Sequence, residues 1–276
     1  MADHPLYNTY LLKRNRAEAT RLGSQHLLWK LHMKHVLHPD IPIKENMAIA
    51  DIGAGTGIWA IEVAMQLHSS ARVAAYDIAD THFPLPEYRP SNATFDVLDF
   101  LGELPSSLVG QFDVVHLRTW AFIIRDNDPS RLIQNAAKML KPGGYIQWED
   151  ARFDSAVVRG DAALKMRQMM SLMSGATKLN FEWVEKIDQH VNLEADLEVI
   201  DCQYKPWSNQ LIPLCMDTFF VALENSGAIL DRLKQVEPSV PSSDEWMSAL
   251  ENVQKESRNS DQLYWHPVTL LARKSG

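Results

Sequence analysis

Three glycines that follow an aspartate near residue 50 have the spacing of a loop that binds a ligand through its backbone. Gly53, Gly55 and Gly57 occupy alternate positions after Asp51, behind a short apolar segment. Glycine has no Cβ, so a bound molecule can come close to the main chain. We therefore expect Asp51, Gly53, Ala54, Gly55 and Gly57 to form a cofactor site at the turn from a buried strand into a helix.

The spacing of these glycines argues against a dinucleotide cofactor. A dinucleotide-binding loop needs its third glycine at position 58, where this chain has Ile58. The next strand-like segment ends at Asp77, about 20 residues beyond the loop, and a carboxylate there can accept hydrogen bonds from both hydroxyls of a ribose. We expect Asp77 and the adjacent Ile78 to bind the ribose, with Asp80 as the nearby alternative.

A third strand-like segment ends in residues suited to a purine base. Leu98 and Phe100 offer apolar side chains for the faces of the base, and Asp99 can accept a hydrogen bond from its amino group. Because the carboxyl ends of parallel strands meet at one edge of a sheet, these residues would lie near Asp77. A loop-capping role is the alternative for Asp99.

These motifs, in this order, resemble those of the class I S-adenosylmethionine-dependent methyltransferases. The resemblance covers residues 48–150 and includes an apolar strand at 112–115 and the Lys-Pro-Gly-Gly segment at 141–144. A closer likeness is to the fungal secondary-metabolism methyltransferases, a group of O- and N-methyltransferases of natural products and related regulators. The segments that carry this likeness are residues 21–22, 25–26, 37–39, 57–60, 112–118 and 144–148.

The resemblance implies S-adenosylmethionine as the cofactor and S-adenosylhomocysteine as the product. The glycine loop would cradle the amino acid part of the cofactor. An N-terminal helix would cover it, and Tyr10, Arg21 or Gln25 could reach its carboxylate, because arginine in particular offers paired donors to such a group. Arg118, at the end of the fourth strand, could meet the cofactor or the substrate.

Methyl transfer from a sulfonium needs few catalytic side chains, because the methyl carbon is already electrophilic. The protein has to hold a nucleophile in line, about 3 to 3.5 Å from that carbon, and exclude water. A hydroxyl or amide acceptor must also lose a proton, and the candidates for the base are His116, Glu149, Asp150 and His190. We place His116 first and Asp150 beside it, while a hydrogen-bonded structural histidine remains the alternative.

Alternating strands and helices would position these residues. The sequence predicts an N-terminal helix that Ser24 caps, with Leu27, Leu28 and Leu31 on its apolar side, running toward residue 37. Apolar runs and turn residues then predict a parallel βαβ pattern. The expected strands are residues 48–51, 71–77, 93–97, 112–117, 145–148, 197–204 and 263–272, and the expected helices lie within 58–67, 128–140, 161–193 and 211–252.

This pattern defines a Rossmann-like α/β fold. We expect the class I methyltransferase arrangement, a mostly parallel seven-stranded sheet with helices on both faces, an N-terminal helical arm and helical cap insertions. The predicted divisions are an arm at 1–46, a cofactor-binding core at 47–150, a cap at 151–262 around strand 197–204, and a last strand at 263–276 that rejoins the sheet.

Composition narrows the partners. The net charge of −8, with no long run of Lys and Arg, argues against nucleic acid as a partner. The sequence has no signal-peptide pattern and no stretch of 18 apolar residues, so we expect a cytoplasmic protein without membrane contact. Cys202 and Cys215 are too few for a disulfide framework, and the histidines at 26, 32, 35 and 38 lack metal-ligand spacing, so we expect no metal.

Three functions fit the sequence. The first is methylation of an oxygen or nitrogen of a small, largely apolar natural product, for which the methionines at 166, 169, 170 and 173 and the phenylalanines at 219 and 220 could line a pocket. The second is a regulatory protein that keeps the fold and acts through protein partners, with a homodimer also possible. The third is rearrangement or cyclisation without methyl transfer, in which the cofactor's positive charge stabilises developing negative charge.

Overall fold

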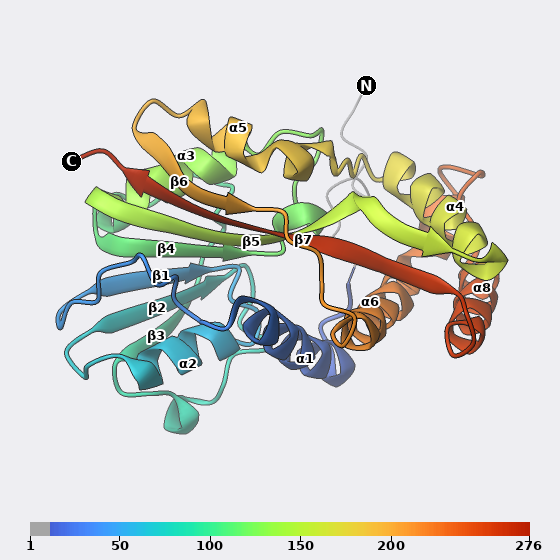
Figure 1. The fold of residues 1–276 in the computed structure, drawn as a ribbon, viewed down its shortest axis with the longest axis horizontal. Coiled ribbons are helices and arrows are strands. Elements are labelled where there is room, and N and C mark those ends of the chain that lie inside the picture. The colour runs from blue at the N-terminus through green and yellow to red at the C-terminus, as the bar shows by residue number, and fades with distance from the viewer. Residues whose placement is uncertain (1–11) are drawn as a thin grey trace.

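A seven-stranded sheet of order β3-β2-β1-β4-β5-β7-β6 runs through the middle of the protein in the computed structural model, which describes residues 12–276 (Figure 1). The pairs from β3 to β5 are parallel, and β7 runs antiparallel to both of its neighbours. This confirms the predicted mostly parallel sheet and the return of the last strand. The strands are β1 (Ala48–Ile52), β2 (Arg72–Asp77), β3 (Ala93–Val97), β4 (Phe112–Arg118), β5 (Leu140–Arg159), β6 (Leu197–Gln203) and β7 (Gln262–Lys274).

Helices cover both faces of the sheet. Helix α2 packs on one face with Ile49, Val73 and Phe95, whereas α3 and α5 pack on the other face (Figure 1). The apolar side chains of β1 alternate between these two cores, as the pleat requires. The helices are α1 (Arg16–Met33), α2 (Ile58–Gln66), α3 (Ser130–Met139), α4 (Asp161–Ala176), α5 (Ile187–Asn192), α6 (Ile212–Ser226), α7 (Leu230–Lys234) and α8 (Ser243–Glu256).

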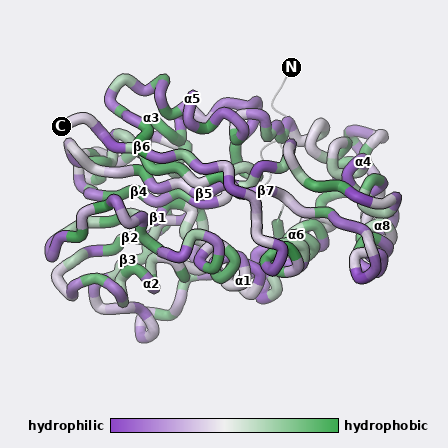
Figure 2. Tube along the Cα trace, in the orientation of Figure 1, coloured by the Kyte–Doolittle hydropathy of each residue, from purple (hydrophilic) through white to green (hydrophobic). Residues whose placement is uncertain are grey.

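Two long strands connect the sheet to the cap. Strand β5 continues through Arg159, beyond the predicted boundary at residue 150, and stays paired with β7 as far as Gln262. Their far ends reach the region of α4, α6 and α8 (Figure 1). Hydrophobic residues dominate α6, whereas the turn from α8 into β7 is hydrophilic (Figure 2). The cap is therefore built on the same sheet as the core.

The predicted start and end of the N-terminal helix are wrong. Asn15 caps α1, because its side chain accepts a hydrogen bond from Glu18 N at 2.9 Å. Ser24 lies inside the helix, where its hydroxyl donates to Thr20 O at 3.1 Å, and the helix ends at Lys34 with a positive φ of 68°. Leu27 and Leu31 of the expected apolar side are exposed, since α1 packs against α6 and α2 through the side that carries Leu28 and Trp29. No helix within residues 12–276 is both long and apolar enough to cross a membrane.

Candidate functional site

A cavity of about 680 Å³ lies at the carboxyl ends of β1, β2, β3 and β4 and extends into the cap. Its volume is in the range of about 300–1,000 Å³ that is usual for small-molecule sites. One end is formed by the glycine loop, the ends of β2 and β3, and α1. At the other end the cavity is lined by Phe122, Phe153, Thr218, Phe219, Ala222 and Trp265.

The glycine loop is fastened to β2 by its own backbone. The N–H groups of Gly53 and Ala54 donate to Tyr76 O at 2.8 and 2.9 Å, and Gly55 N donates to Asp77 Oδ2 at 2.9 Å. Gly55 has a φ of 57°, and a Cβ there would lie 3.0 Å from Leu22 Cδ1 of α1. Of the predicted loop residues, Gly53 and Gly55 line the cavity, whereas Asp51, Ala54 and Gly57 do not.

Asp77 stands where a ribose ligand is expected. Its carboxylate accepts Gly55 N through Oδ2 and Ala79 N through Oδ1, the latter at 3.2 Å. A carboxylate has about four acceptor positions, so two remain for a ligand. Asp77 and Ile78 line the cavity, whereas the alternative, Asp80, is not part of the lining.

The residues after β3 form the adjoining wall. Leu98, Asp99 and Phe100 all line the cavity, and Leu98 N donates to Asp77 O at 2.8 Å, which ties the two strand ends together. Asn135 of α3 holds this turn from below, because its Nδ2 donates to Phe100 O at 2.6 Å and to Gly102 O at 3.2 Å. The predicted adenosine-binding residues are thus brought to one edge.

The predicted N-terminal residues divide into two groups. Arg21 and Gln25 line the cavity, whereas Tyr10 lies outside the described residues. The guanidinium of Arg21 is bound in a fork by Glu18, with Nε and Nη2 at 2.9 and 2.7 Å from the two carboxylate oxygens. Asn225 of α6 donates to the same Glu18 at 2.9 Å, so this buried group joins α1 to the cap.

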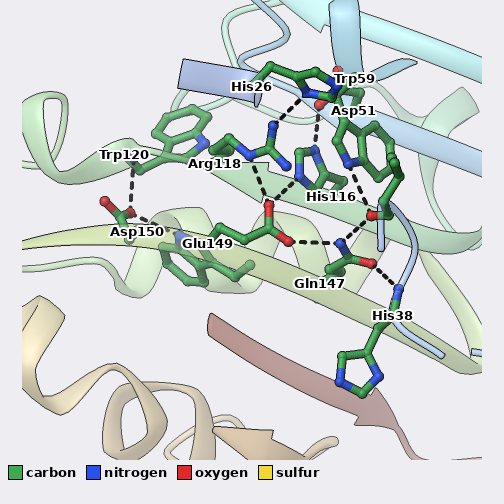
Figure 3. Close-up of polar contacts among 12 residues, drawn as sticks. His26, His38, Asp51, Trp59, His116, Arg118, Trp120, Gln147, Glu149 and Asp150 are labelled. Atoms are coloured by element: carbon green, nitrogen blue, oxygen red, sulfur yellow. Dashed lines mark hydrogen bonds and ion pairs between the residues drawn. The ribbon is translucent and has the colours of Figure 1, made fainter. Parts of the chain in front are cut away.

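The structure does not place His116 where a general base would act. Its imidazole is 1% exposed, stacks on Trp59 with ring centroids 3.7 Å apart, and is not part of the cavity lining. Nδ1 lies 2.7 Å from Asp51 Oδ1, and Nε2 lies 2.7 Å from Glu149 Oε2 (Figure 3). Burial lowers the pKa of this imidazole, but the two carboxylates outweigh burial and raise it above its ordinary value. Both ring nitrogens are therefore engaged inside the protein.

The other predicted bases are also away from the cavity. Asp150 is fully buried and accepts four N–H groups, from Trp120, Ala121 and Ala151 of the main chain and from the indole of Trp148. Burial raises the pKa of Asp150 to about 6. Its visible role is to hold the turn after β4. Glu149, Asp150 and His190 are all absent from the cavity lining.

Sequence reasoning missed most of the cap end of the cavity. Phe153 is central there, with ring centroids 4.7 Å from Phe122, 5.5 Å from Phe219 and 6.1 Å from Trp265. Of the apolar residues proposed for the pocket, Phe219 lines it, whereas Phe220 and the four methionines of α4 are packed elsewhere in the core. The aromatic residues that were missed come from three separate elements, and no local spacing connects them.

Trp120 lines the cavity next to the glycine loop. It begins a short 3-10 turn, η3 (Trp120–Phe122), directly after β4. Its indole N–H donates to Ile52 O at 3.3 Å, and its ring lies over the glycine loop, where a Cβ on Gly53 would come within 3.2 Å. Glycine at position 53 therefore makes room for this ring as well as for a ligand.

The strand order, the glycine loop after β1 and the acidic residue at the end of β2 define the fold of a class I methyltransferase domain. Residues 49–144 match the family described as Methyltransferase domain. The chain is 31% identical over 180 residues to the methyltransferase grgD of Penicillium sp, which covers 62% of each chain. It is 28% identical over 166 residues to the N-methyltransferase tcpN of Claviceps purpurea, which covers 59% of each.

Solved structures agree on the fold. Coclaurine N-methyltransferase, solved with N-methylheliamine and S-adenosylhomocysteine, is 13% identical and superposes with a TM-score of 0.54 over 92% of this chain and 71% of that one. The chain spans about six tenths of the length of the two curated relatives named above. Residues 49–144 therefore resemble a methyltransferase domain, and the two curated relatives are a methyltransferase and an N-methyltransferase of fungi.

Proposed function

We propose that the protein is an S-adenosylmethionine-dependent methyltransferase that moves a methyl group to an oxygen or nitrogen of a small, largely apolar natural product. The observation that carries this proposal is the continuity of one cavity from the glycine loop and Asp77 to the aromatic residues of the cap. A cofactor and an acceptor can thus lie end to end within one cavity, as in-line transfer requires.

The residues at the core end fit the cofactor. Gly53 and Gly55 leave the loop backbone open to the cavity, and Asp77 keeps two acceptor positions for ribose hydroxyls. When bound, the cofactor supplies an electrophilic methyl carbon. Asp77 and the turn at residues 98–100 would hold its adenosine part.

The cap end suits an apolar acceptor. Its aromatic lining removes apolar surface of a ligand from water, and Phe153, Phe219 and Trp265 are each no more than 3% exposed, so their ring positions are fixed by packing. The acceptor nucleophile would be positioned mainly by shape.

Calorimetric titration with S-adenosylmethionine and S-adenosylhomocysteine tests the cofactor. The variant Asp77→Ala should bind both on the order of 30- to 150-fold more weakly, because two hydrogen bonds to a charged group are lost. Asp80→Ala is the matched control and should bind like the wild type, since Asp80 does not line the cavity. Equal affinity in all three folded proteins would remove Asp77 from the site.

Incubation with S-adenosylmethionine and a panel of apolar phenols and amines tests the reaction. A product heavier by one CH₂ group, formed together with S-adenosylhomocysteine, would support methyl transfer. An altered product of unchanged mass would instead favour rearrangement or cyclisation. Failure of the folded protein to bind either cofactor form would contradict the methyltransferase proposal and favour a protein that acts through partners.

A further inference from the structure

A chain of buried polar side chains runs beneath the glycine loop and ends at Arg118 (Figure 3). Strand register explains how these side chains meet. His116 of β4 lies opposite Asp51 of β1 and Gln147 of β5, and Arg118 lies opposite Glu149. Side chains two residues apart on a strand share a face, so all five point to the α2 side of the sheet. Arg118 is the member nearest the carboxyl edge.

Two neighbours fix the orientation of the Arg118 guanidinium. Its Nε donates to Glu149 Oε2 at 3.0 Å, and its Nη1 donates to Nδ1 of His26 at 3.1 Å. An accepting Nδ1 places the proton of His26 on Nε2, which lies 2.7 Å from Glu62 Oε2. Burial followed by the charge of Arg118 lowers the pKa of His26, in keeping with a neutral ring. The guanidinium is therefore held on one side by a carboxylate and on the other by an imidazole.

The rest of that guanidinium faces the cavity. The Arg118 side chain is 12% exposed and lines the cavity beside Gly53, Gly55 and Thr119. Its Nη2 has no hydrogen-bond partner among residues 12–276. Arg21, the arginine that the sequence favoured for an anion at this end, differs in that its paired donors are already bound by Glu18 in a buried fork.

The charges of these buried polar side chains balance one another, so the side of Arg118 that faces the cavity is not needed for this balance. Glu149 is fully buried, and although burial raises its pKa, Arg118 and His116 outweigh burial and lower it to about 2. Asp51 and Glu149 thus face His116 and Arg118 as two carboxylates against two cations, provided that His116 is protonated between them. The second oxygen of Glu149 accepts Gln147 Nε2 at 2.7 Å, so Glu149 itself is also held in place.

We propose that Arg118 binds the carboxylate of the methionine part of the cofactor, and that Glu149, His26 and His116 are positioning residues for its guanidinium. The proposal rests on the proposed function. A planar guanidinium matches a carboxylate through two parallel N–H groups, and a guanidinium already fixed by its neighbours loses little conformational freedom on binding. His116 then serves the site indirectly, by holding Glu149 and Asp51.

A pair of ligands isolates this contact. S-adenosylhomocysteine and 5′-methylthioadenosine share the adenosine and the thioether sulfur, but the second lacks the amino acid part. The variant Arg118→Ala should bind S-adenosylhomocysteine roughly 10- to 100-fold more weakly, whereas its affinity for 5′-methylthioadenosine should stay within about twofold of wild type. Retained 5′-methylthioadenosine binding also shows that the variant is folded.

Further variants separate positioning from general damage. Arg118→Lys keeps the charge but loses the paired donors, so it should lie between wild type and Arg118→Ala for S-adenosylhomocysteine. Glu149→Gln should, like Arg118→Ala, weaken the binding of S-adenosylhomocysteine more than that of 5′-methylthioadenosine. A merely structural role of Glu149 would leave the ratio of these two affinities unchanged. Asp77→Ala is the contrasting control, because loss of the ribose contact should weaken both ligands in parallel.

The results distinguish the two proposals. Unchanged S-adenosylhomocysteine binding by Arg118→Ala, or an equal loss of both ligands, would overturn the role of Arg118 and leave the proposed function standing. Selective loss of S-adenosylhomocysteine would support it. A wild-type protein that binds neither ligand would overturn the proposed function, and the role of Arg118 with it.

Discussion

Gly57 is the position at which one added methyl group should disturb both the fold and the site. It begins α2 with a φ of 71°, its N–H donates to Ala54 O, and its carbonyl accepts Ile61 N at 2.9 Å. A Cβ at this position would overlap the ring of Phe95 on β3. That ring is 7% exposed and has Phe83 at 5.4 Å between centroids, so it has little room to move.

Two terms set the size of the effect of Gly57→Ala on the free energy of unfolding. An L-residue in the left-handed region costs about 1–2 kcal/mol. Forcing a methyl group into a packed site costs about 1–3 kcal/mol more. Gly110 is the matched control, because its φ is 67° and a Cβ there would meet nothing within 4 Å. Gly110→Ala should therefore show only the first term.

Urea unfolding followed by circular dichroism, on wild type and both variants, measures these terms. We expect Gly57→Ala to be about 1–3 kcal/mol less stable than Gly110→Ala and to bind S-adenosylhomocysteine more weakly, because a displaced α2 start shifts the loop. Adding Phe95→Leu to Gly57→Ala should recover part of the difference. Equal destabilisation by the two alanine variants would refute the reasoning, since it would mean that the Phe95 contact contributes nothing.

Three further changes test other parts of the structure. Burial raises the pKa of Glu149, but its partners lower it to about 2, against 4.5 when unperturbed. The stabilisation of the fold by ionised Glu149 is therefore present above about pH 4.5 and is lost as the pH falls toward 2. In urea unfolding between about pH 7 and 3, the free energy of unfolding of Glu149→Gln should fall less steeply with pH than that of the wild type. Phe153→Ala removes a ring that is 3% exposed and should cost about 3–5 kcal/mol in urea unfolding. Asn135→Leu removes the side-chain donor to Phe100 O and one of the two donors to Gly102 O, so calorimetry should show S-adenosylhomocysteine and 5′-methylthioadenosine weakened in parallel.

Local patterns were enough to predict the core of the fold. The glycine loop lies between an apolar strand and a helix within ten residues of sequence, and the structure has β1 and α2 there. Asp77 and Asp99 were predicted at strand ends, and both line the cavity. Their position could be predicted because the carboxyl edge of a parallel sheet collects residues that each occupy the same local position.

The role of His116 depended on partners that no local pattern identifies. Its position at the end of a strand is the same for a catalytic base and for a buried histidine held between two carboxylates. The difference arises from Asp51 and Glu149, which lie 65 and 33 residues away in the sequence and meet it only through the register of three strands. The aromatic end of the cavity was missed for the same reason, because Phe122, Phe153 and Trp265 come together only in the folded sheet and cap.

The buried cluster beneath the loop also needs a physical reason. Charged groups inside a protein rarely add net stability, because their desolvation offsets their attraction, and apolar replacements of the same volume are often neutral or better. A role in positioning Arg118 supplies such a reason. A fixed guanidinium favours ligand binding even where the cluster adds nothing to the stability of the fold. The two explanations differ in how Glu149→Gln binds the two ligands: a cluster that only stabilises the fold affects both ligands alike, whereas a positioning cluster changes the ratio of the two affinities. That ratio therefore reports on why this polar chain lies inside the sheet.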